Sequence, residues 1–265
     1  MESVDRRILY NEEVAGGYFR LGLEWKGARV SPGQFVMVRV SDGLDPLLRR
    51  PFGVYGVKGA KGVDPSRGDT VELLYKVVGR GTKILSAREK GESLNVLGPL
   101  GNGFPEPDER EKVIMVAGGM GLVPFLMLSE RLGGGRLLYG ARGKTEAGLI
   151  DDFRNTGCAV SVSTEDGSVG TKGLVTGLLE KEISGDSVVY ACGPVGMLKA
   201  VTGVVAAHSV KCFVSLERSM ACGIGVCLGC AVKVRGHREH ENKFYSMVCS
   251  DGPVFDSEEI DWEVL

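Results

Sequence analysis

Apolar and polar residues alternate along the first hundred residues in short segments that end at glycine or proline. The clearest of these segments are residues 17–25, 32–40, 51–57 and 70–78. Successive side chains of a strand point to opposite faces, so this alternation is typical of antiparallel strands. We therefore expect residues 1–105 to form a small antiparallel β barrel.

The pattern changes at residues 98–112, a stretch rich in turn formers and charges that indicates a linker between domains. Beyond it, apolar strands alternate with glycine turns and helices. The expected strands are residues 113–117, 136–142, 158–164 and 187–191, and the expected helices are residues 125–132 and 195–207. This order predicts a doubly wound parallel sheet over residues 106–212, followed by a small third module at residues 213–265.

Four cysteines in the third module follow the ligand pattern of a plant-type iron–sulfur protein. Cys222, Cys227 and Cys230 have the spacing C-x4-C-x2-C, and Cys249 follows at a distance. Four thiolates in this pattern hold a 2Fe-2S cluster, and such a cluster carries one electron. Glycines among the ligands let the backbone turn its N–H groups toward the sulfur atoms. The sequence therefore predicts single-electron transfer.

A structural zinc site or disulfides are the alternatives for these cysteines. Zinc would normally take two C-x2-C pairs or a mixture of cysteine and histidine. His237 and His240 lie between the third and fourth cysteines, in a polar stretch where we expect solvated side chains. The other cysteines, Cys158, Cys192 and Cys212, have apolar or small neighbours, and we expect at least two of them to be reduced thiols in a core.

Length and composition limit the classes of function. With 265 residues, the chain has room for two modest domains and a small appendage. The formal charge of −2 provides no general attraction to nucleic acid or to an anionic membrane. Residues 1–13 are charged, and no apolar run is long enough to cross a bilayer. We expect a soluble cytoplasmic protein that binds neither nucleic acid nor membrane.

Two segments of the first region have the chemistry of an anion clamp. Arg50 precedes Pro51, which fixes the local backbone and would aim the guanidinium at one place. Gly81 and Thr82 open a short helix, where free N–H groups favour a phosphate. Together the two segments would bind one diphosphate. The alternative is an ordinary surface turn and a capped helix.

Two glycine-containing turns stand between strands and helices of the second region. They are Gly118-Gly119-Met120-Gly121 and Cys192-Gly193-Pro194. Ligands bind at the carboxyl ends of parallel strands, so both turns are candidates for nucleotide binding, although neither has the G-x-G-x-x-G pattern. The alternative is that both are tight connections. Arg142 and Lys144 follow another strand, where they either meet a 2′-phosphate or are solvated.

The order of these motifs resembles the ferredoxin–NADP reductase superfamily. The matching residues are 49–54, 73–82, 118–124 and 190–194, and the resemblance covers about the first 210 residues. Residues 217–230 and 248–255 are similar to the electron-transfer subunits of NAD-dependent (class 1B) dihydroorotate dehydrogenases. The cysteine-containing tail is the more specific of the two likenesses.

The resemblance implies FAD in the barrel, NAD in the second region and a 2Fe-2S cluster in the tail. It also implies an FMN-containing catalytic partner that oxidises dihydroorotate, in a heterotetramer with two copies of each chain. The residues expected to contact the flavin and its diphosphate are Arg50, Pro51, Phe52, Gly53, Leu74, Tyr75, Lys76, Gly81 and Thr82. Those expected at the nucleotide are Gly118, Gly119, Gly121, Cys192, Gly193 and Pro194, with Cys192 near the nicotinamide and flavin rings.

One position departs from the resemblance. Relatives usually have serine or threonine where this chain has Gly53, so a side-chain hydrogen bond near the flavin is lost and only a backbone N–H remains.

Electron counting gives the expected function. Nicotinamide exchanges two electrons at once and the cluster one, so a flavin has to lie between them. The three modules use the whole chain, we find no acid–base set for substrate chemistry, and a substrate-oxidising (β/α)8 barrel alone needs about 250 residues. The resemblance then implies an oxidoreductase subunit that passes electrons from the FMN partner to NAD+ in pyrimidine biosynthesis.

Two alternatives remain open at this point. One is an NAD(P)H-oxidising subunit of a sulfhydrogenase or of a ferredoxin:NADP oxidoreductase, which would have the same three modules. The other is a non-enzymatic, zinc-stabilised binding module.

Overall fold

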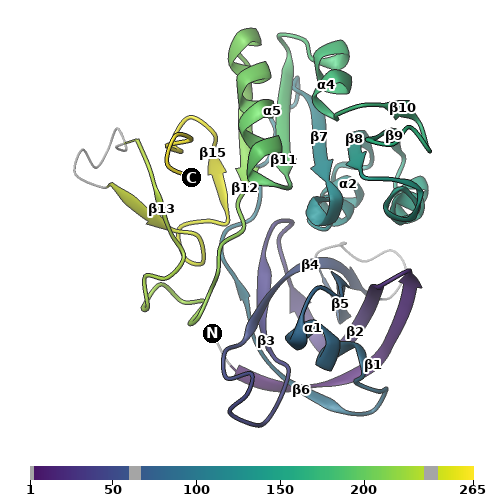
Figure 1. Ribbon diagram of the computed structural model, residues 1–265, viewed down its shortest axis with the longest axis vertical. Helices are drawn as coiled ribbons and strands as arrows, with labels where there is room; N and C mark the ends of the chain where they lie inside the picture. The colour runs from purple at the N-terminus through teal and green to yellow at the C-terminus, as the bar shows by residue number, and fades with distance from the viewer. Residues whose placement is uncertain (1–2, 60–66, 236–243) are drawn as a thin grey trace.

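The computed structural model describes residues 3–59, 67–235 and 244–265. A barrel, a layered region of strands and helices, and a small C-terminal region follow one another along the chain (Figure 1). His237 and His240, which we expect to be solvated, lie outside the described residues.

Six antiparallel strands close into a barrel in the order β1, β2, β5, β4, β3, β6. They are β1 (Ser3–Ala15), β2 (Tyr18–Arg29), β3 (Phe35–Arg39), β4 (Arg50–Lys58), β5 (Arg67–Lys76) and β6 (Ser93–Leu100), with helix α1 (Arg80–Ser86) before the last. Apolar side chains from all six strands fill the interior. The predicted barrel is confirmed.

The apolar alternation does not predict strands β1 and β6. Ile8 is the one buried side chain of β1, so this strand lacks the alternation of apolar and polar residues that marks the others. Pairing with β2 on one side and β6 on the other holds β1 in the barrel. Strand β6 contains residues 98–100, which the sequence pattern assigns to the linker.

Seven strands form a second sheet in the order β10, β9, β8, β7, β11, β12, β15. They are β7 (Lys112–Gly118), β8 (Gly135–Ala141), β9 (Cys158–Thr164), β10 (Thr171–Lys172), β11 (Ser187–Cys192), β12 (Lys211–Ser215) and β15 (Val254–Asp256). Neighbours run parallel, except that β15 is antiparallel to β12. The predicted doubly wound sheet is confirmed, and its order reverses between β7 and β11, where ligands bind in such sheets.

Helices cover both faces of this sheet. They are η1 (Gly119–Leu122), α2 (Phe125–Leu132), α3 (Lys144–Ala147), η2 (Gly148–Asn155), α4 (Thr176–Glu182) and α5 (Val195–His208). Helices α4 and α5 share a core with Ile114 and Val116 of β7, whereas α2 and η2 share one with Met115 and Ala117. Burial on both faces explains why β7 is a continuous apolar run. Within the described residues, no helix has the length and apolar composition of a membrane span.

The C-terminal region is joined to the large sheet. Strands β13 (Ala231–Lys233) and β14 (Tyr245–Met247) pair with each other, while β15 extends the large sheet. Val232, Val248 and Trp262 belong to the same buried core as α4 and α5. The cysteine region is therefore held against the α/β layers.

The barrel lies below the carboxyl ends of β7 and β11 in Figure 1. Two carboxylates link the two regions. Glu146 accepts a hydrogen bond of 2.7 Å from the Tyr18 hydroxyl, and Asp152 accepts one of 2.6 Å from the Tyr55 hydroxyl. Arg20 also bonds to Asp152. These contacts place the ligand-binding edge of the sheet against the mouth of the barrel.

Candidate functional site

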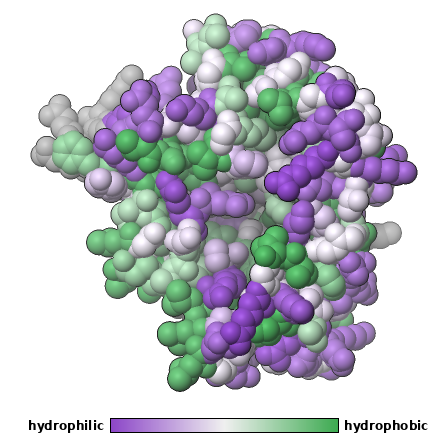
Figure 2. Space-filling view, viewed as in Figure 1, coloured by the Kyte–Doolittle hydropathy of each residue, from purple (hydrophilic) through white to green (hydrophobic). Residues whose placement is uncertain are grey.

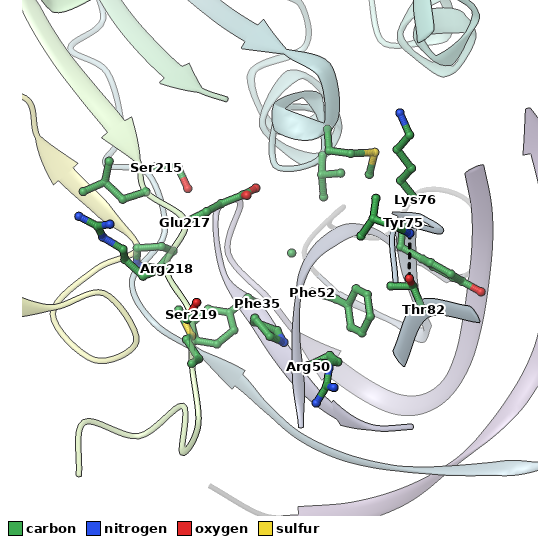
Figure 3. Close-up of a pocket in the computed structure, with 18 of the residues that line it drawn as sticks. Phe35, Arg50, Phe52, Tyr75, Lys76, Thr82, Ser215, Glu217, Arg218 and Ser219 are labelled. Atoms are coloured by element: carbon green, nitrogen blue, oxygen red, sulfur yellow. Dashed lines mark hydrogen bonds between the residues drawn. The ribbon is translucent and has the colours of Figure 1, made fainter. Parts of the chain in front are cut away.

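A cavity of about 1130 Å3 lies where the barrel, the sheet and the C-terminal region meet (Figure 3). All nine residues expected at the flavin line it: Arg50, Pro51, Phe52, Gly53, Leu74, Tyr75, Lys76, Gly81 and Thr82. Cys192 lines the same cavity from the carboxyl end of β11, and Gly229 and Ala231 line it from the cysteine region. The three regions thus share one cavity.

The two halves of the expected anion clamp touch each other. A Cβ atom on Gly81 would lie 2.9 Å from Nε of Arg50, so no side chain fits between the arginine and the start of α1. One Arg50 N–H group donates to the carbonyl of Leu48, which fixes the guanidinium beside the helix. The positive charge and the backbone of α1 therefore face the same part of the cavity.

The Thr82 hydroxyl is engaged by the backbone just before α1. Its Oγ1 accepts hydrogen bonds from the backbone N–H groups of Val78 and Gly79, at 3.0 and 3.1 Å. The hydroxyl therefore caps the turn before α1, while Thr82 also lines the cavity. The first intrahelical backbone bond runs from the Lys83 N–H to the Gly79 carbonyl, so the N–H groups of the first helical residues, Arg80 to Thr82, have no backbone acceptor within the helix.

Packing explains the glycine at position 53. Gly53 pairs with Phe35 in the barrel, and a Cβ atom there would lie 3.1 Å from Cγ1 of Val123. Val123 belongs to the turn that follows β7, and it also lines the cavity. A serine or threonine at this position would require Val123 to move.

The two glycine-containing turns of the sheet pack against each other. A Cβ atom on Gly121 would lie 2.0 Å from the carbonyl oxygen of Cys192, and one on Gly118 would lie 3.0 Å from Pro194. Of the six residues expected at the nucleotide, only Cys192 lines the large cavity, and Met120 and Pro124 line it instead of the neighbouring glycines. Gly118 and Gly121 thus allow a close backbone contact, and a nucleotide role for them stays a prediction.

Cys192 is a buried thiol in the cavity wall. Burial raises the pKa of this thiol far above its ordinary value, and the nearby Glu217 carboxylate adds to the shift. Burial outweighs a hydrogen bond with Ser215 that lowers the pKa, so the side chain is a neutral thiol and a poor nucleophile. Its placement suits contact with a ligand ring, which stays a prediction.

Glu217, Arg218 and Ser219 line the cavity although the sequence motifs do not assign them to a site. Figure 3 shows Glu217 directed toward the cavity from the segment after β12. The residue is exposed in the cavity wall, and loss of hydration in this recess raises the pKa of its carboxyl group. In the sequence, the one indication that Glu217 belongs to a site is its position. It follows an apolar strand and comes just before the loop that carries Cys222, Cys227 and Cys230, here called the cysteine loop.

The four candidate ligand cysteines form two pairs. Sγ of Cys230 lies 3.2 Å from Sγ of Cys249, too far for a disulfide. In the other pair, the N–H of Cys227 donates to Sγ of Cys222 at 3.4 Å. No disulfide joins any of the seven cysteines, all of which lie within the described residues.

Backbone N–H groups point at every sulfur atom of the two pairs. The donors include Ile224 to Cys222 at 3.4 Å, Gly225 to Cys249 at 3.1 Å, Gly229 to Cys227 at 3.5 Å and Cys249 to Cys230 at 3.4 Å. Gly223 and Gly225 have φ angles of +75° and +81°, which turn the loop so that these donors face inward. Such donors stabilise negative charge on thiolates and sulfides.

The donor set fits a 2Fe-2S cluster, in which each of two irons takes two thiolates. Across residues 3–59, 67–235 and 244–265, no three His, Cys, Asp or Glu side chains converge as ligands of a single metal ion. The arrangement in pairs is therefore closer to the needs of a two-iron cluster than to those of one zinc ion.

The large cavity fits a flavin dinucleotide. Its volume is slightly above the usual range for small-molecule sites, which is about 300–1000 Å3, and a dinucleotide is larger than most small ligands. Phe52 and Tyr75 supply aromatic surface, and Arg50 supplies the planar donors that a diphosphate requires. Because Gly81 has no side chain, the Arg50 guanidinium lies directly against the start of α1.

Comparison with known proteins agrees with this geometry. A sequence model described as the iron-sulfur cluster binding domain of dihydroorotate dehydrogenase B matches residues 217–261. Curated relatives described as dihydroorotate dehydrogenase B (NAD(+)), electron transfer subunit, are similar over most of the chain. The protein from Caldanaerobacter subterraneus subsp. tengcongensis is 41% identical over 96% of this chain and 96% of its own length. The protein from Bacillus cereus is 36% identical over 96% of this chain and 97% of its own.

Solved structures share the fold. A chain of an NADH-dependent reduced ferredoxin-NADP oxidoreductase, studied for flavin-based electron bifurcation, has a TM-score of 0.79 and 29% identity, covering 100% of this chain and 92% of that chain. A ferredoxin NADP+ reductase from Neisseria gonorrhoeae with bound FAD and NADP has a TM-score of 0.64 and 16% identity, covering 78% of this chain and 92% of that one. With the identity to the curated relatives, these findings show that the chain belongs to the family of electron transfer subunits of dihydroorotate dehydrogenase B (NAD(+)).

Proposed function

We propose that this chain is the subunit of a dihydroorotate dehydrogenase B through which electrons pass from a catalytic partner to NAD+. The partner would oxidise dihydroorotate at its FMN, in the pyrimidine pathway of the cytoplasm, within a heterotetramer of two copies of each chain. When bound, FAD exchanges electrons singly with a 2Fe-2S cluster and in pairs with NAD. The residues described above hold and orient these groups.

The observation that carries this proposal is the shared wall of the large cavity. Arg50 and Phe52 come from the barrel, Cys192 from the sheet, and Gly229 from the loop that also carries Cys227 and Cys230. A flavin in this cavity would lie next to the cysteine loop on one side and next to the edge of the sheet on the other. An electron path from cluster to flavin to nucleotide then needs no movement of whole domains.

Reconstitution tests the proposed function. The chain, loaded with FAD and iron, is mixed with an FMN-containing dihydroorotate dehydrogenase subunit, and reduction of NAD+ by dihydroorotate is followed. We expect turnover only in the mixture. Turnover with a reduced ferredoxin in place of that partner, and none with the FMN subunit, would instead favour the ferredoxin:NADP oxidoreductase alternative.

Exposed apolar side chains mark where the partner would dock. They lie on the cysteine loop and on the connection between β3 and β4, and they are Ile224, Val226, Leu228, Leu44, Leu47 and Leu48. A Cβ atom on Gly223 would lie 2.6 Å from Cγ of Met37, so the cysteine loop packs directly on β3, whose end leads into the other loop. Figure 2 shows apolar surface along the left and lower left of the molecule, where Figure 1 places these loops.

An apolar surface beside an exposed cluster ligand suits a partner that must receive or deliver electrons there. Cys227 is exposed, and its neighbour Val226 is 74% exposed. Clusters of exposed apolar side chains usually mark binding surfaces. We therefore place the FMN subunit on this face.

Replacing Val226 with aspartate is expected to weaken assembly with the FMN subunit by about 10-fold or more, because the interface would bury an unpaired charge. Val264→Asp is the matched control, since Val264 is also exposed, at 58%, but lies outside both loops. Size-exclusion chromatography over a concentration series measures both. If both variants weaken assembly with the FMN subunit equally, the partner does not dock on this face.

A further inference from the structure

A second cavity, of about 510 Å3, lies beside the first between the barrel and the sheet. It is bordered by the turn between β1 and β2, by the loop after β8 and by the loop after β9. Its lining includes Tyr18, Arg142, Lys144, Glu146, Asp166 and Ser168. Among the described residues, Lys76 is the one side chain that lines both cavities.

The position of Lys76 matters for a ligand that extends through both cavities. The loops after β8 and β9 are at the carboxyl ends of parallel strands, next to the edge that carries Cys192. If NAD binds along this edge, as the proposed function requires, its two nucleoside halves are joined by a diphosphate. A dinucleotide that extends from one cavity into the other would pass the Lys76 ammonium group.

Lys76 is held in place by groups from both regions. Its Nζ atom lies 3.1 Å from Oε1 of Glu146 and 4.7 Å from the centre of the Tyr18 ring. The Tyr18 hydroxyl donates to the same Oε1 at 2.7 Å, and Oε2 of Glu146 accepts the N–H of Arg142 at 2.9 Å. Figure 3 shows Lys76 extending away from Arg50 and Thr82.

Glu146 is a fixed anion. Its side chain is only 13% exposed. Burial raises the pKa of the Glu146 carboxyl, but the Arg142 N–H, the Tyr18 hydroxyl and Lys76 outweigh burial, so the pKa is below its ordinary value. A lysine ammonium has three N–H donors, and Glu146 occupies one of them, which leaves donors for a ligand.

We propose that Glu146 is a positioning residue for the pyridine nucleotide, which holds the Lys76 ammonium at the junction of the two cavities to receive the nucleotide's diphosphate. A flexible lysine loses conformational freedom when it binds an anion, and this loss weakens binding. The contacts with Glu146 and Tyr18 restrict Lys76 before the nucleotide arrives. The inference rests on the proposed function, because it takes NAD as the ligand.

Glu146→Gln tests the inference through equilibrium binding of NAD+ to the FAD-loaded, oxidised chain, measured by calorimetry. Ordering one lysine side chain on binding predicts a roughly 3- to 10-fold higher Kd. The KM for NADH should rise by a similar factor, with the maximal rate of flavin reduction unchanged. Tighter binding would overturn the inference, since it would mean that Glu146 competes with the nucleotide for Lys76.

Asp152→Asn is the matched control. Asp152 also bonds to a tyrosine and a cation of the barrel, Tyr55 and Arg20, but none of the three lines either cavity. We expect Asp152→Asn to leave the Kd for NAD+ within about 2-fold, because it removes a contact between regions without touching Lys76. An equal effect of both variants would show that Glu146 acts only through the contact between regions, and the inference would fail.

A double-mutant cycle gives the sharpest result. In a Lys76→Gln background, Glu146→Gln should change the Kd for NAD+ by less than about 2-fold, because the side chain that it positions is gone. The same fold-change in both backgrounds would overturn the inference. The proposed function fails separately, if the unmodified chain binds no NAD+ and its flavin is not reduced by NADH.

Discussion

Replacing Cys227 with serine is expected to lower the dihydroorotate-driven reduction of NAD+ by about 100-fold or more, while NADH still reduces the bound flavin. Loss of an outer partner of a metal ligand alone costs about 10- to 100-fold, and loss of the ligand costs at least as much. Cys227 is exposed on the loop, so the substitution removes a thiolate without opening a core. Steady-state assays with the partner and stopped-flow reduction by NADH separate the two halves of the path.

Cys158→Ser is the control for this prediction. Cys158 is a free, buried thiol on β9 that lies in neither cavity wall. Both electron-transfer rates should survive that substitution. Full activity of Cys227→Ser with the partner would mean that electrons reach the flavin without the cluster.

Arg50→Ala should weaken FAD binding by about 10- to 150-fold. An arginine that binds a phosphate through charged hydrogen bonds contributes about 1.5–3 kcal/mol, which corresponds to that range in Kd. Arg50→Lys keeps the charge but loses the planar pair of donors. Its affinity for FAD should therefore lie between that of the unmodified chain and that of Arg50→Ala. Flavin content after dialysis and titration of the apoprotein with FAD measure the effect.

Arg49 provides the neighbouring control. Its guanidinium donates to the carbonyl of Asn95 at 2.9 Å and to Ser3 at 3.0 Å, and it does not line the cavity. Arg49→Ala should therefore retain FAD, although the barrel loses these hydrogen bonds. If Arg50→Ala retains FAD as well as Arg49→Ala does, the diphosphate is bound elsewhere.

The barrel side of the site was predictable from sequence because its chemistry is local. Arg50 to Gly53 lie on one strand, and Leu74 to Lys76 end another that lies next to it in the closed barrel. Each short motif therefore brings its functional side chains to the same opening. The contact between Gly81 and Arg50 was not predictable, because it depends on how α1 returns to β4.

The part of the site that the sheet forms was less predictable. A glycine can allow close contact with another backbone segment or with a ligand, and the sequence does not distinguish the two. Gly121 contacts the backbone of Cys192, and a ligand contact would have required a glycine equally well. Glu217 had no periodic signal at all. It reaches the cavity because β12 pairs with β11, which sets Ser215 beside Cys192.

Charge patterns also concealed part of the fold. Strand β1 presents charged side chains to solvent and has a single buried residue, so its sequence resembles that of a polar segment. Strand β15 has only three residues, and its partner β12 lies far away in the sequence. Each of these strands depends on pairing with a strand distant in the sequence, β6 for β1 and β12 for β15, and a single sequence does not reveal such pairing.

The pairing of β12 with β15 has a consequence for biosynthesis. The chain leaves this sheet after Ser215 and returns to it at Val254. The segment that carries the four cysteines is therefore anchored at both ends in neighbouring strands. During translation at about 5–20 residues per second, the interval between these two positions takes roughly 2–8 s. Throughout that interval the backbone groups along this edge of β12 have no partner from β15, and open edges of this kind promote aggregation. Synthesis of the C-terminal residues therefore also covers this edge of β12, with the short strand β15 as the new edge of the sheet.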